Sequence, residues 1–267
     1  MADETKKIFI TMPNLTNDQI KYLLTLPPED IVRWYESKGF RFSWRWQDTW
    51  QSAHTRSFTV AKVMKLDILQ SIKKEVDKIF KDGITFEQFQ KELEPELKRL
   101  GWWGKVKAKD VPGYVPQPGV DPEKIVQLGS PRRLETIYQT NANVAYNAGR
   151  YNSYVQNAAS RPLWKYHQID RPTYRKSHAP FKDKVFRWDD PIWNIIMPPN
   201  GWNCGCYITA HTESEISGQG IKISDGKDFM KYIEKGIPEE WQFNPAKDYS
   251  TWLPDLTKYD NEFKQQF

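Results

Sequence analysis

Apolar residues in the first part of the chain recur with the period of an α-helix. The clearest stripe has alternating spacings of three and four residues and comprises Leu69, Ile72, Val76 and Ile79. This spacing places the side chains on one helix face. The helical pattern as a whole runs from about Asp48 to Lys81, with Gly83 as its stop. Shorter helices are predicted before it, one through Tyr22 and Leu23 and one over residues 27–39.

A second amphipathic helix is predicted after Gly83. Thr85 and Gln88 have the spacing of a capping box, and the apolar stripe that follows comprises Phe86, Phe89, Leu93, Leu97 and Leu100. Pro95 lies inside this stripe. Proline removes a helical hydrogen bond and clashes with the preceding turn, so a kink or a split is expected there. The pair Trp102–Trp103 after the helix is expected to be a packing lock or a partner surface.

A third and longer helix is predicted in the middle of the chain. Residues 105–129 are rich in proline and glycine and predict a long connection. The helix then opens at Ser130, a capping residue followed by Pro131, and runs to about Asn157. It carries a small-residue face of Ala142, Ala145, Ala148 and Gly149. It also holds three residues that are unfavourable inside helices and need side-chain hydrogen bonds there: Asn141, Asn143 and Asn147.

Beyond Ser160 the pattern changes to short alternating runs. Strands are predicted at 164–169, 184–188 and 206–210, and turns rich in Pro, Gly, Asn and Asp separate them. A short helix follows near residues 228–235. This order of elements predicts an α+β fold.

The predicted fold has a helical N-terminal part followed by a core domain in which the long helix packs on a small sheet. The expected divisions are a helical N-terminal region (1–104), a linker that marks a domain boundary (105–129), the core domain (130–215) and a C-terminal extension (216–267).

Composition and charge narrow the class of protein. The hydrophobic share is 39% and the aromatic share 14%, so much of the burial should come from Trp, Tyr and Phe. A net charge of +5 favours polyanions only weakly, and a solvated surface of mixed charge explains it as well. No stretch approaches the roughly 18 apolar residues that would span a membrane. The first residues lack the order of a signal peptide, and the two cysteines do not form a secreted disulfide framework. We therefore expect synthesis in a reducing cytoplasm.

The residues with the most chemical potential gather between Tyr174 and Cys206. This segment holds one of the four histidines, both cysteines and three of the twelve tryptophans. Cys204, Cys206 and His178, together with His167, could supply two sulfur and two nitrogen ligands to zinc. Against this, one intervening residue is not the usual spacing of a zinc knuckle, and on a strand the two cysteines would face opposite ways. Buried, inert cysteines without any cofactor are the alternative.

The same residues also allow an enzymatic hypothesis. A zinc- or thiol-dependent hydrolase could use His178 with Cys204 or Cys206 as base and nucleophile. The sequence contains no Gly-rich phosphate loop, no nucleophile elbow and no His-Glu-x-x-His. A non-enzymatic role is therefore the leading expectation.

Two charged pairs have both a structural and a functional interpretation. Asp189 and Asp190 could be an acid–base pair, although capping of the turn before Pro191 is the simpler role. Arg132 and Arg133 stand at the start of a predicted helix, where the macrodipole disfavours cations. That position suggests a partner carboxylate or phosphate, and a solvated helix face is the alternative.

An ordered series of motifs resembles a known family. In chain order, the motifs are Trp50 with Ala53 and His54, then residues 58–62, 83–89, 100–104, 128–134, 137–141, 148–150, His178, 184–191 and 198–206. Together they resemble the phage Mu F-like minor head proteins, also called phage head morphogenesis proteins, over roughly residues 25–215. The signature positions that this resemblance marks are Arg132, Arg133, Thr140, Asn141, Arg150, Arg175, His178, Trp188, Asp189, Asp190, Trp193 and Trp202.

The resemblance implies a role in building the phage head. It implies a minor capsid protein of the virion, made in the bacterial host cytoplasm or from a prophage, located inside the head and associated with the portal. The implied partners are the portal protein, capsid or scaffold proteins and, non-specifically, the DNA that is packaged. It implies no membrane, no enzymatic activity and no cofactor. Zinc at His178, Cys204 and Cys206 stays the one metal option, and it comes from the residues rather than from the resemblance.

Three positions depart from the pattern of that family. Arg175–Lys176 stands where the family usually has Arg-Pro, Asp183 stands where it has glycine, and Gly205 stands between the cysteines where it has arginine. These changes lie around His178 and between the cysteines, so they weigh against a demanding active site. The segment is interpreted as a signature loop region that pins the core domain.

Overall fold

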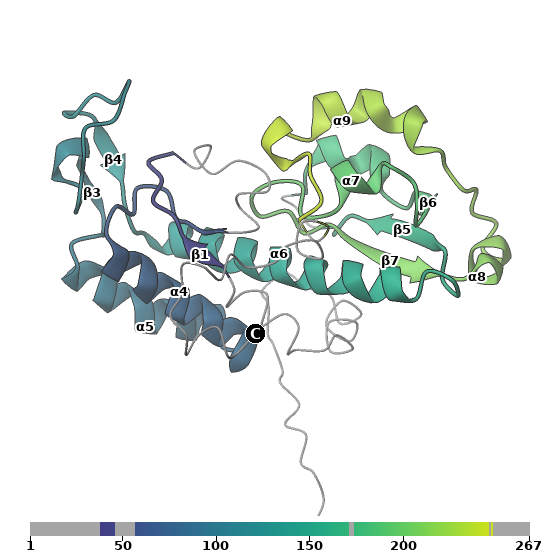
Figure 1. The fold of residues 1–267 in the computed structure, drawn as a ribbon, viewed down its shortest axis with the longest axis horizontal. Coiled ribbons are helices and arrows are strands. Elements are labelled where there is room, and N and C mark those ends of the chain that lie inside the picture. Colours follow the sequence, from purple (N-terminus) through teal and green to yellow (C-terminus); the bar gives the residue numbers. More distant parts are fainter. Residues whose placement is uncertain (1–37, 46–56, 171–173, 246, 248–267) are drawn as a thin grey trace, which may run out of the picture.

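The computed structural model describes residues 38–45, 57–170, 174–245 and 247. The short helices predicted before Gly39, and the motif residues Trp50, Ala53 and His54, lie outside these ranges. Within them, helices and small, mainly antiparallel sheets make an α+β fold, as the sequence predicts (Figure 1).

Two amphipathic helices, α4 (Leu66–Lys81) and α5 (Phe86–Arg99), pack against each other. The predicted stripe of α4 is fully buried in the first hydrophobic core. The capping box of α5 is present, with Thr85 Oγ1 accepting from the backbone of Gln88 and the Gln88 side chain accepting from the backbone of Thr85. The expected split at Pro95 is wrong, because α5 continues through it. Buried side chains on both sides of the proline, Leu93 and Leu97, hold the helix to the core.

The helix predicted from about Asp48 begins only at Leu66, so that prediction is wrong for the described residues before it. Strand β2 (Ser57–Phe58) pairs in parallel with β1 (Gly39–Phe40) instead. Phe58 and Val60 are buried on either side of a less buried Thr59, which is the period of an extended chain rather than a helix. The chain then turns at Lys62, whose φ of 64° is left-handed.

The long helix α6 (Pro131–Gln156) joins the two main hydrophobic cores and confirms the predicted helix from Ser130 to about Asn157. The Ser130 side chain caps it by accepting from the backbone N–H of Arg133 at 3.3 Å. The N-terminal half of α6 packs on α4 and α5, and the C-terminal half lies beside the sheet of the second core (Figure 1). One continuous helix therefore carries side chains into both cores.

Residues 105–129, expected to be a linker, contain a hairpin. Strand β3 (Lys105–Lys107) pairs antiparallel with β4 (Ile125–Gln127), and the 3₁₀ turn η2 (Ala108–Asp110) follows β3. Ala108, Val126 and Leu128 belong to the first core, so apolar contacts hold the hairpin despite its prolines and glycines. The interpretation of these residues as a domain boundary remains a prediction.

The second core is built on a three-stranded antiparallel sheet in the order β6 (Val185–Arg187), β5 (Leu163–His167) and β7 (Tyr207–His211). All three strands were predicted within about a residue or two. Trp164 and Tyr166 of β5 enter this core with Phe186 of β6 and Ile208 of β7. The short helices around the sheet are η3 (Lys176–Phe181), α7 (Trp193–Ile196), α8 (Glu213–Gly218), η4 (Gly226–Phe229), α9 (Met230–Gly236) and η5 (Glu239–Trp241).

Helix α9 covers most of the helix predicted at residues 228–235. Figure 1 shows α7 and α9 on the side of the sheet away from α6. Among the described residues, no helix combines the length and the apolar character needed to cross a bilayer.

Candidate functional site

The fold brings His178 and both cysteines together. His178 lies in η3, and Cys204 and Cys206 lie in the loop directly before β7. His178 Nδ1 is 3.7 Å from Cys204 Sγ and 3.5 Å from Cys206 Sγ. The three side chains are only 1%, 3% and 5% exposed. The opposite orientation expected for cysteines on a strand does not apply, because β7 begins only at Tyr207 and both sulfurs lie near the same nitrogen of His178.

Neighbouring hydrogen bonds hold the cysteine loop in place. The backbone N–H of Cys204 donates to the carbonyl of Gly201 at 3.1 Å. The side chain of Asn143, from α6, donates to the carbonyl of Cys204 at 3.0 Å. Arg175 donates to the carbonyl of Trp202 at 2.6 Å, so it ties the segment before η3 to the same loop. The loop is therefore fixed from both the long helix and the η3 segment.

The electrostatics of the cluster favour a charged Cys204. A hydrogen bond from Cys206 and a second one from His178 lower the pKa of the Cys204 thiol, and together they outweigh burial, which raises it. Burial, with Cys206 and Cys204 close by, raises the pKa of Tyr166, so its phenol stays protonated. That phenol donates to Asn200 Oδ1 at 2.8 Å.

His167, the fourth ligand considered for zinc, does not join the cluster. Its Nε2 shares a hydrogen bond of 2.7 Å with the Thr209 hydroxyl, and its ring stacks on Tyr207 with 4.6 Å between ring centroids. The only described group of possible metal ligands is the set of three, His178, Cys204 and Cys206, whose ligand atoms lie within 4.8 Å of one another.

A small cavity of about 10 Å³ opens beside the cluster. A cavity of this volume has room for about one water molecule. Its lining comprises Gln168, Ile169, Tyr174, Arg175, His178, Asn203, Cys204, Gly205 and Cys206.

Two of the departures from the family pattern have a visible structural context. Asp183 has a φ of 60°, a left-handed conformation that glycine adopts without strain. A Cβ atom on Gly205 would lie 2.8 Å from Cδ1 of the buried Ile169. An arginine between the cysteines would therefore require Ile169 to shift, and glycine leaves it in place.

Arg133 contacts backbone carbonyls and an aromatic ring, and the expectation of a carboxylate or phosphate partner for Arg132 and Arg133 stays a prediction. Its guanidinium donates to the carbonyls of Gln127 and Leu128 at 2.9 and 3.1 Å and to that of Ala61. It also lies 4.6 Å from the centroid of the Trp102 ring. Trp102 is fully buried and donates to the carbonyl of Lys62, which matches the expected packing lock. Arg132, next to it on α6, is exposed.

The signature residues after β6 form a turn. The Asp190 carboxylate accepts from the backbone N–H of Ile192 and from that of Gly226, both at 2.9 Å. This confirms the capping interpretation for Asp190 and also ties the turn to η4. Asp189 is exposed and pairs with Arg187 at 3.2 Å. The indole N–H of Trp193 donates to the carbonyl of Arg187 at 2.8 Å. The backbone N–H of Trp188 donates to the carbonyl of Pro162.

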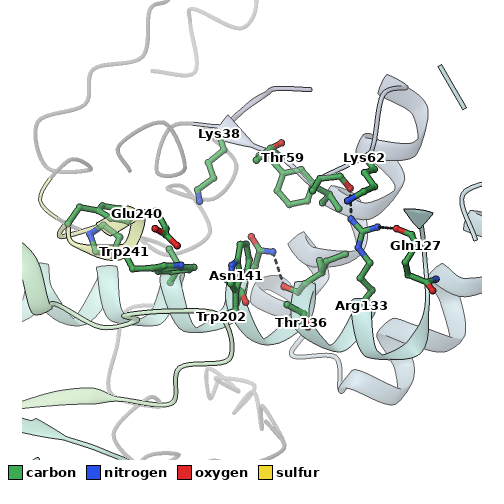
Figure 2. Close-up of a pocket in the computed structure, with 18 residues that line it drawn as sticks. Lys38, Thr59, Lys62, Gln127, Arg133, Thr136, Asn141, Trp202, Glu240 and Trp241 are labelled. Carbon is green, nitrogen blue, oxygen red and sulfur yellow. Dashed lines mark hydrogen bonds between the residues drawn. The ribbon is translucent and has the colours of Figure 1, made fainter. Parts of the chain in front are cut away.

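A larger pocket of about 340 Å³ lies along α6 and was not anticipated from the sequence. Four signature residues line it: Arg133, Thr140, Asn141 and Trp202. Trp202 and Trp241 lie at one end, and Arg133 and Lys62 lie at the other (Figure 2). Burial, with Lys73 nearby, lowers the pKa of Lys38 on its wall to about 7. The pocket walls come from segments far apart in sequence, so no local pattern could reveal it.

The remaining signature arginine, Arg150, is buried on α6. Its guanidinium carbon lies 5.6 Å from the centroid of the Tyr207 ring on β7. It therefore contributes to the contact between the long helix and the sheet.

Comparison with known proteins places the chain in a family. The profile described as "Phage Mu protein F like protein" matches residues 70–209, which include most of α4, all of α5 and α6, strands β5 and β6, the start of β7 and the three-residue cluster. The chain is 39% identical to the "Putative capsid assembly protein F" of Escherichia phage Mu over 230 residues, covering 85% of this chain and 50% of that protein. It is 40% identical to the "Mu-like prophage FluMu F protein" of Haemophilus influenzae over 200 residues, covering 74% of this chain and 45% of that protein.

The chain spans about half the length of these two relatives. No solved structure matches it significantly. The profile covers more than half of the 267 residues, and the identity to both relatives extends over most of the chain. The chain therefore belongs to the family of phage Mu protein F like proteins.

Proposed function

We propose that this protein is a minor structural component of a phage head and acts in head assembly. The observation that carries the proposal is the family match over residues 70–209, together with a relative named as a capsid assembly protein that is 39% identical over 85% of this chain. The chain spans half of that relative. The proposal therefore covers only the part of head assembly that these residues carry out.

The way the signature residues are used supports a structural role. Arg133 binds three backbone carbonyls, and Asp190 accepts from two backbone N–H groups in separate segments. Trp202 packs edge-on against Trp241, with 5.2 Å between ring centroids. Residues used in this way fix loops and helix ends, and fully satisfied polar contacts of this kind make a fold rigid.

An enzymatic role has less support from the geometry. A hydrolase that used His178 with Cys204 or Cys206 would need room for a substrate beside these atoms. The adjacent cavity of about 10 Å³ has the size of one water molecule. We therefore propose a non-enzymatic protein.

The finer proposal is that the protein lies inside the head, beside the portal, and contacts the portal protein and capsid or scaffold proteins. Its net charge of +5 would add a weak, non-specific attraction to the packaged DNA. Such binding must weaken as salt concentration rises, because it depends on the release of counterions.

The test is an in-frame deletion of the coding region in the phage or prophage that encodes it, with complementation from a plasmid. The expected result is a loss of filled, infectious heads that the plasmid restores. Normal yields of filled heads without the protein would refute the assembly role. Mass spectrometry of purified virions and co-purification with the portal protein of the same phage then test location and partner separately.

A further inference from the structure

The distances within the three-residue cluster match those of a zinc site. Zinc binds sulfur at about 2.3 Å and imidazole nitrogen at about 2.0–2.1 Å, so a tetrahedral site places nitrogen and sulfur about 3.6 Å apart. His178 Nδ1 lies 3.7 Å from Cys204 Sγ and 3.5 Å from Cys206 Sγ. The nitrogen thus already has the correct spacing to both sulfurs.

The spacing of the two sulfurs is compatible with the same site. In a tetrahedral zinc site two sulfurs are about 3.8 Å apart, and the ligand atoms of the cluster lie within 4.8 Å of one another. Closing the remaining gap needs a movement of at most about 1 Å, which small rotations of the two cysteine side chains can supply.

We propose that His178 Nδ1, Cys204 Sγ and Cys206 Sγ bind one zinc ion. Two thiolates and one neutral imidazole carry a charge of −2, which a divalent zinc ion cancels, so the buried cluster becomes neutral when it is loaded. The donor set of two sulfurs and one nitrogen selects zinc over magnesium or calcium, which prefer oxygen. The small cavity lined by Arg175 and Asn203 leaves room for one water molecule as the fourth ligand.

The ion would join two segments that are far apart in sequence. His178 belongs to η3, and the cysteines lie 26 and 28 residues later in the loop before β7. Among the described residues, His178 Nε2 is buried and has no hydrogen-bond partner, so nothing on that side of the ring holds it to the sheet. Coordination through Nδ1 would fix the ring and fasten η3 to the loop. We expect a structural ion that stabilises the fold, and the inference is independent of the proposed role in head assembly.

The experiment uses the full chain, purified without a metal-binding tag from cells supplied with zinc. Elemental analysis is expected to find about one zinc ion per chain in the wild type and in His167→Gln, a control for the histidine outside the cluster. Cys204→Ser with Cys206→Ser should bind none. His178→Cys, which offers another zinc ligand, should retain zinc, whereas His178→Gln should lose most of it.

Cobalt and a chelator provide readouts that do not depend on the variants folding. Wild-type protein reconstituted with Co²⁺ should show sulfur-to-cobalt charge-transfer absorption, which two thiolate ligands produce. Removal of zinc by a chelator should lower the midpoint of thermal unfolding. Folded wild-type protein that contains no zinc after growth in zinc, and shows no such absorption with Co²⁺, would overturn the proposal. Equal zinc content in the double serine variant would overturn it as well.

Discussion

The side-chain amide of Asn143, in the middle of α6, donates a hydrogen bond of 3.0 Å to the carbonyl oxygen of Cys204. Asparagine is a poor residue inside a helix because its side chain competes for backbone hydrogen bonds. Here that side chain contacts the cysteine loop instead, 61 residues away in sequence. The unfavourable residue is thus explained by a tertiary contact that positions the candidate metal site.

Asn143→Ala should reduce the free energy of unfolding by about 1 kcal/mol. The variant loses a hydrogen bond and leaves the Cys204 carbonyl without this donor, while the better helix propensity of alanine offsets part of the loss. Asn157→Ala, at the C-cap of α6, is the control for a local asparagine contact, because Asn157 is exposed and its amide donates to the nearby carbonyl of Ser153. It should change stability by less than about 0.5 kcal/mol. Urea unfolding of both variants measures the difference, and equal losses would show that the link to Cys204 adds nothing.

Arg133→Lys should destabilise the protein by roughly 2 kcal/mol although it keeps the charge. Lysine cannot reproduce the planar fork that donates to three carbonyls and stacks on Trp102. Arg132→Lys, at the exposed neighbouring position, should stay within about 0.5 kcal/mol of the wild type. Thermal or urea unfolding of the two variants is the measurement. A wild-type stability for Arg133→Lys would mean that charge alone, rather than geometry, matters at this position.

The elements of this fold were predictable where local periodicity and packing agree. The stripe of α4, the capping box of Thr85 and Gln88, and the Ser130 cap of α6 all appear as the sequence indicates. The prediction failed at residues 57–65 because the apolar residues there fit a strand and a turn as well as a helix. The alternative of a split at Pro95 was wrong, because burial of Leu93 and Leu97 outweighs the loss of one hydrogen bond, whereas the alternative of a kink stays a prediction.

The candidate site was only partly predictable, because contacts between segments far apart in sequence form it. The sequence identified His178, Cys204 and Cys206 as the rare reactive residues, but it could not show that the loop before β7 turns both sulfurs toward one nitrogen. The pocket lined by Arg133 and Trp202 depends on segments that meet only in the folded chain. Local patterns carry no information about such contacts.

Asp190→Ala should reduce stability by roughly 2–4 kcal/mol, because the carboxylate accepts from two backbone N–H groups and hydrogen bonds to charged groups are the stronger ones. Asp190→Asn keeps one acceptor oxygen and should fall between alanine and the wild type. Asp189→Ala removes only an exposed pair with Arg187 and should cost less than about 1 kcal/mol. The midpoint of urea unfolding, at an unchanged slope, measures each change. A larger loss at Asp189 than at Asp190 would contradict the capping role.

The stability of the protein should fall as pH decreases below about 6.5, and His167 should account for part of that fall. Burial lowers the pKa of His167 to about 4, with a further contribution from Lys165 that outweighs the opposing effect of Asp183. Its Nε2 and that of His211 both contact the hydroxyl of Thr209, at 2.7 and 2.6 Å. The folded protein therefore holds a neutral imidazole at a position where the unfolded chain takes up a proton at a pH of about 6.5.

The sign of this pH dependence follows from proton uptake by the unfolded chain. Between a pH of about 6.5 and a pH of about 4 the unfolded state binds more protons at this residue, so acidification favours unfolding. From pH 7.5 to pH 5 the loss from His167 should be roughly 2 kcal/mol. The measurement is the free energy of unfolding of the wild type and of His167→Gln across that interval. The carboxylates are the same in both proteins, so their contribution cancels in the difference. The variant is less stable at pH 7.5 if the Thr209 hydrogen bond matters, yet it should lose less stability on acidification. His211→Gln, which lacks the other imidazole of the pair, should retain the His167 part of the slope. Parallel profiles for the wild type and His167→Gln would show that His167 is not held neutral by its surroundings.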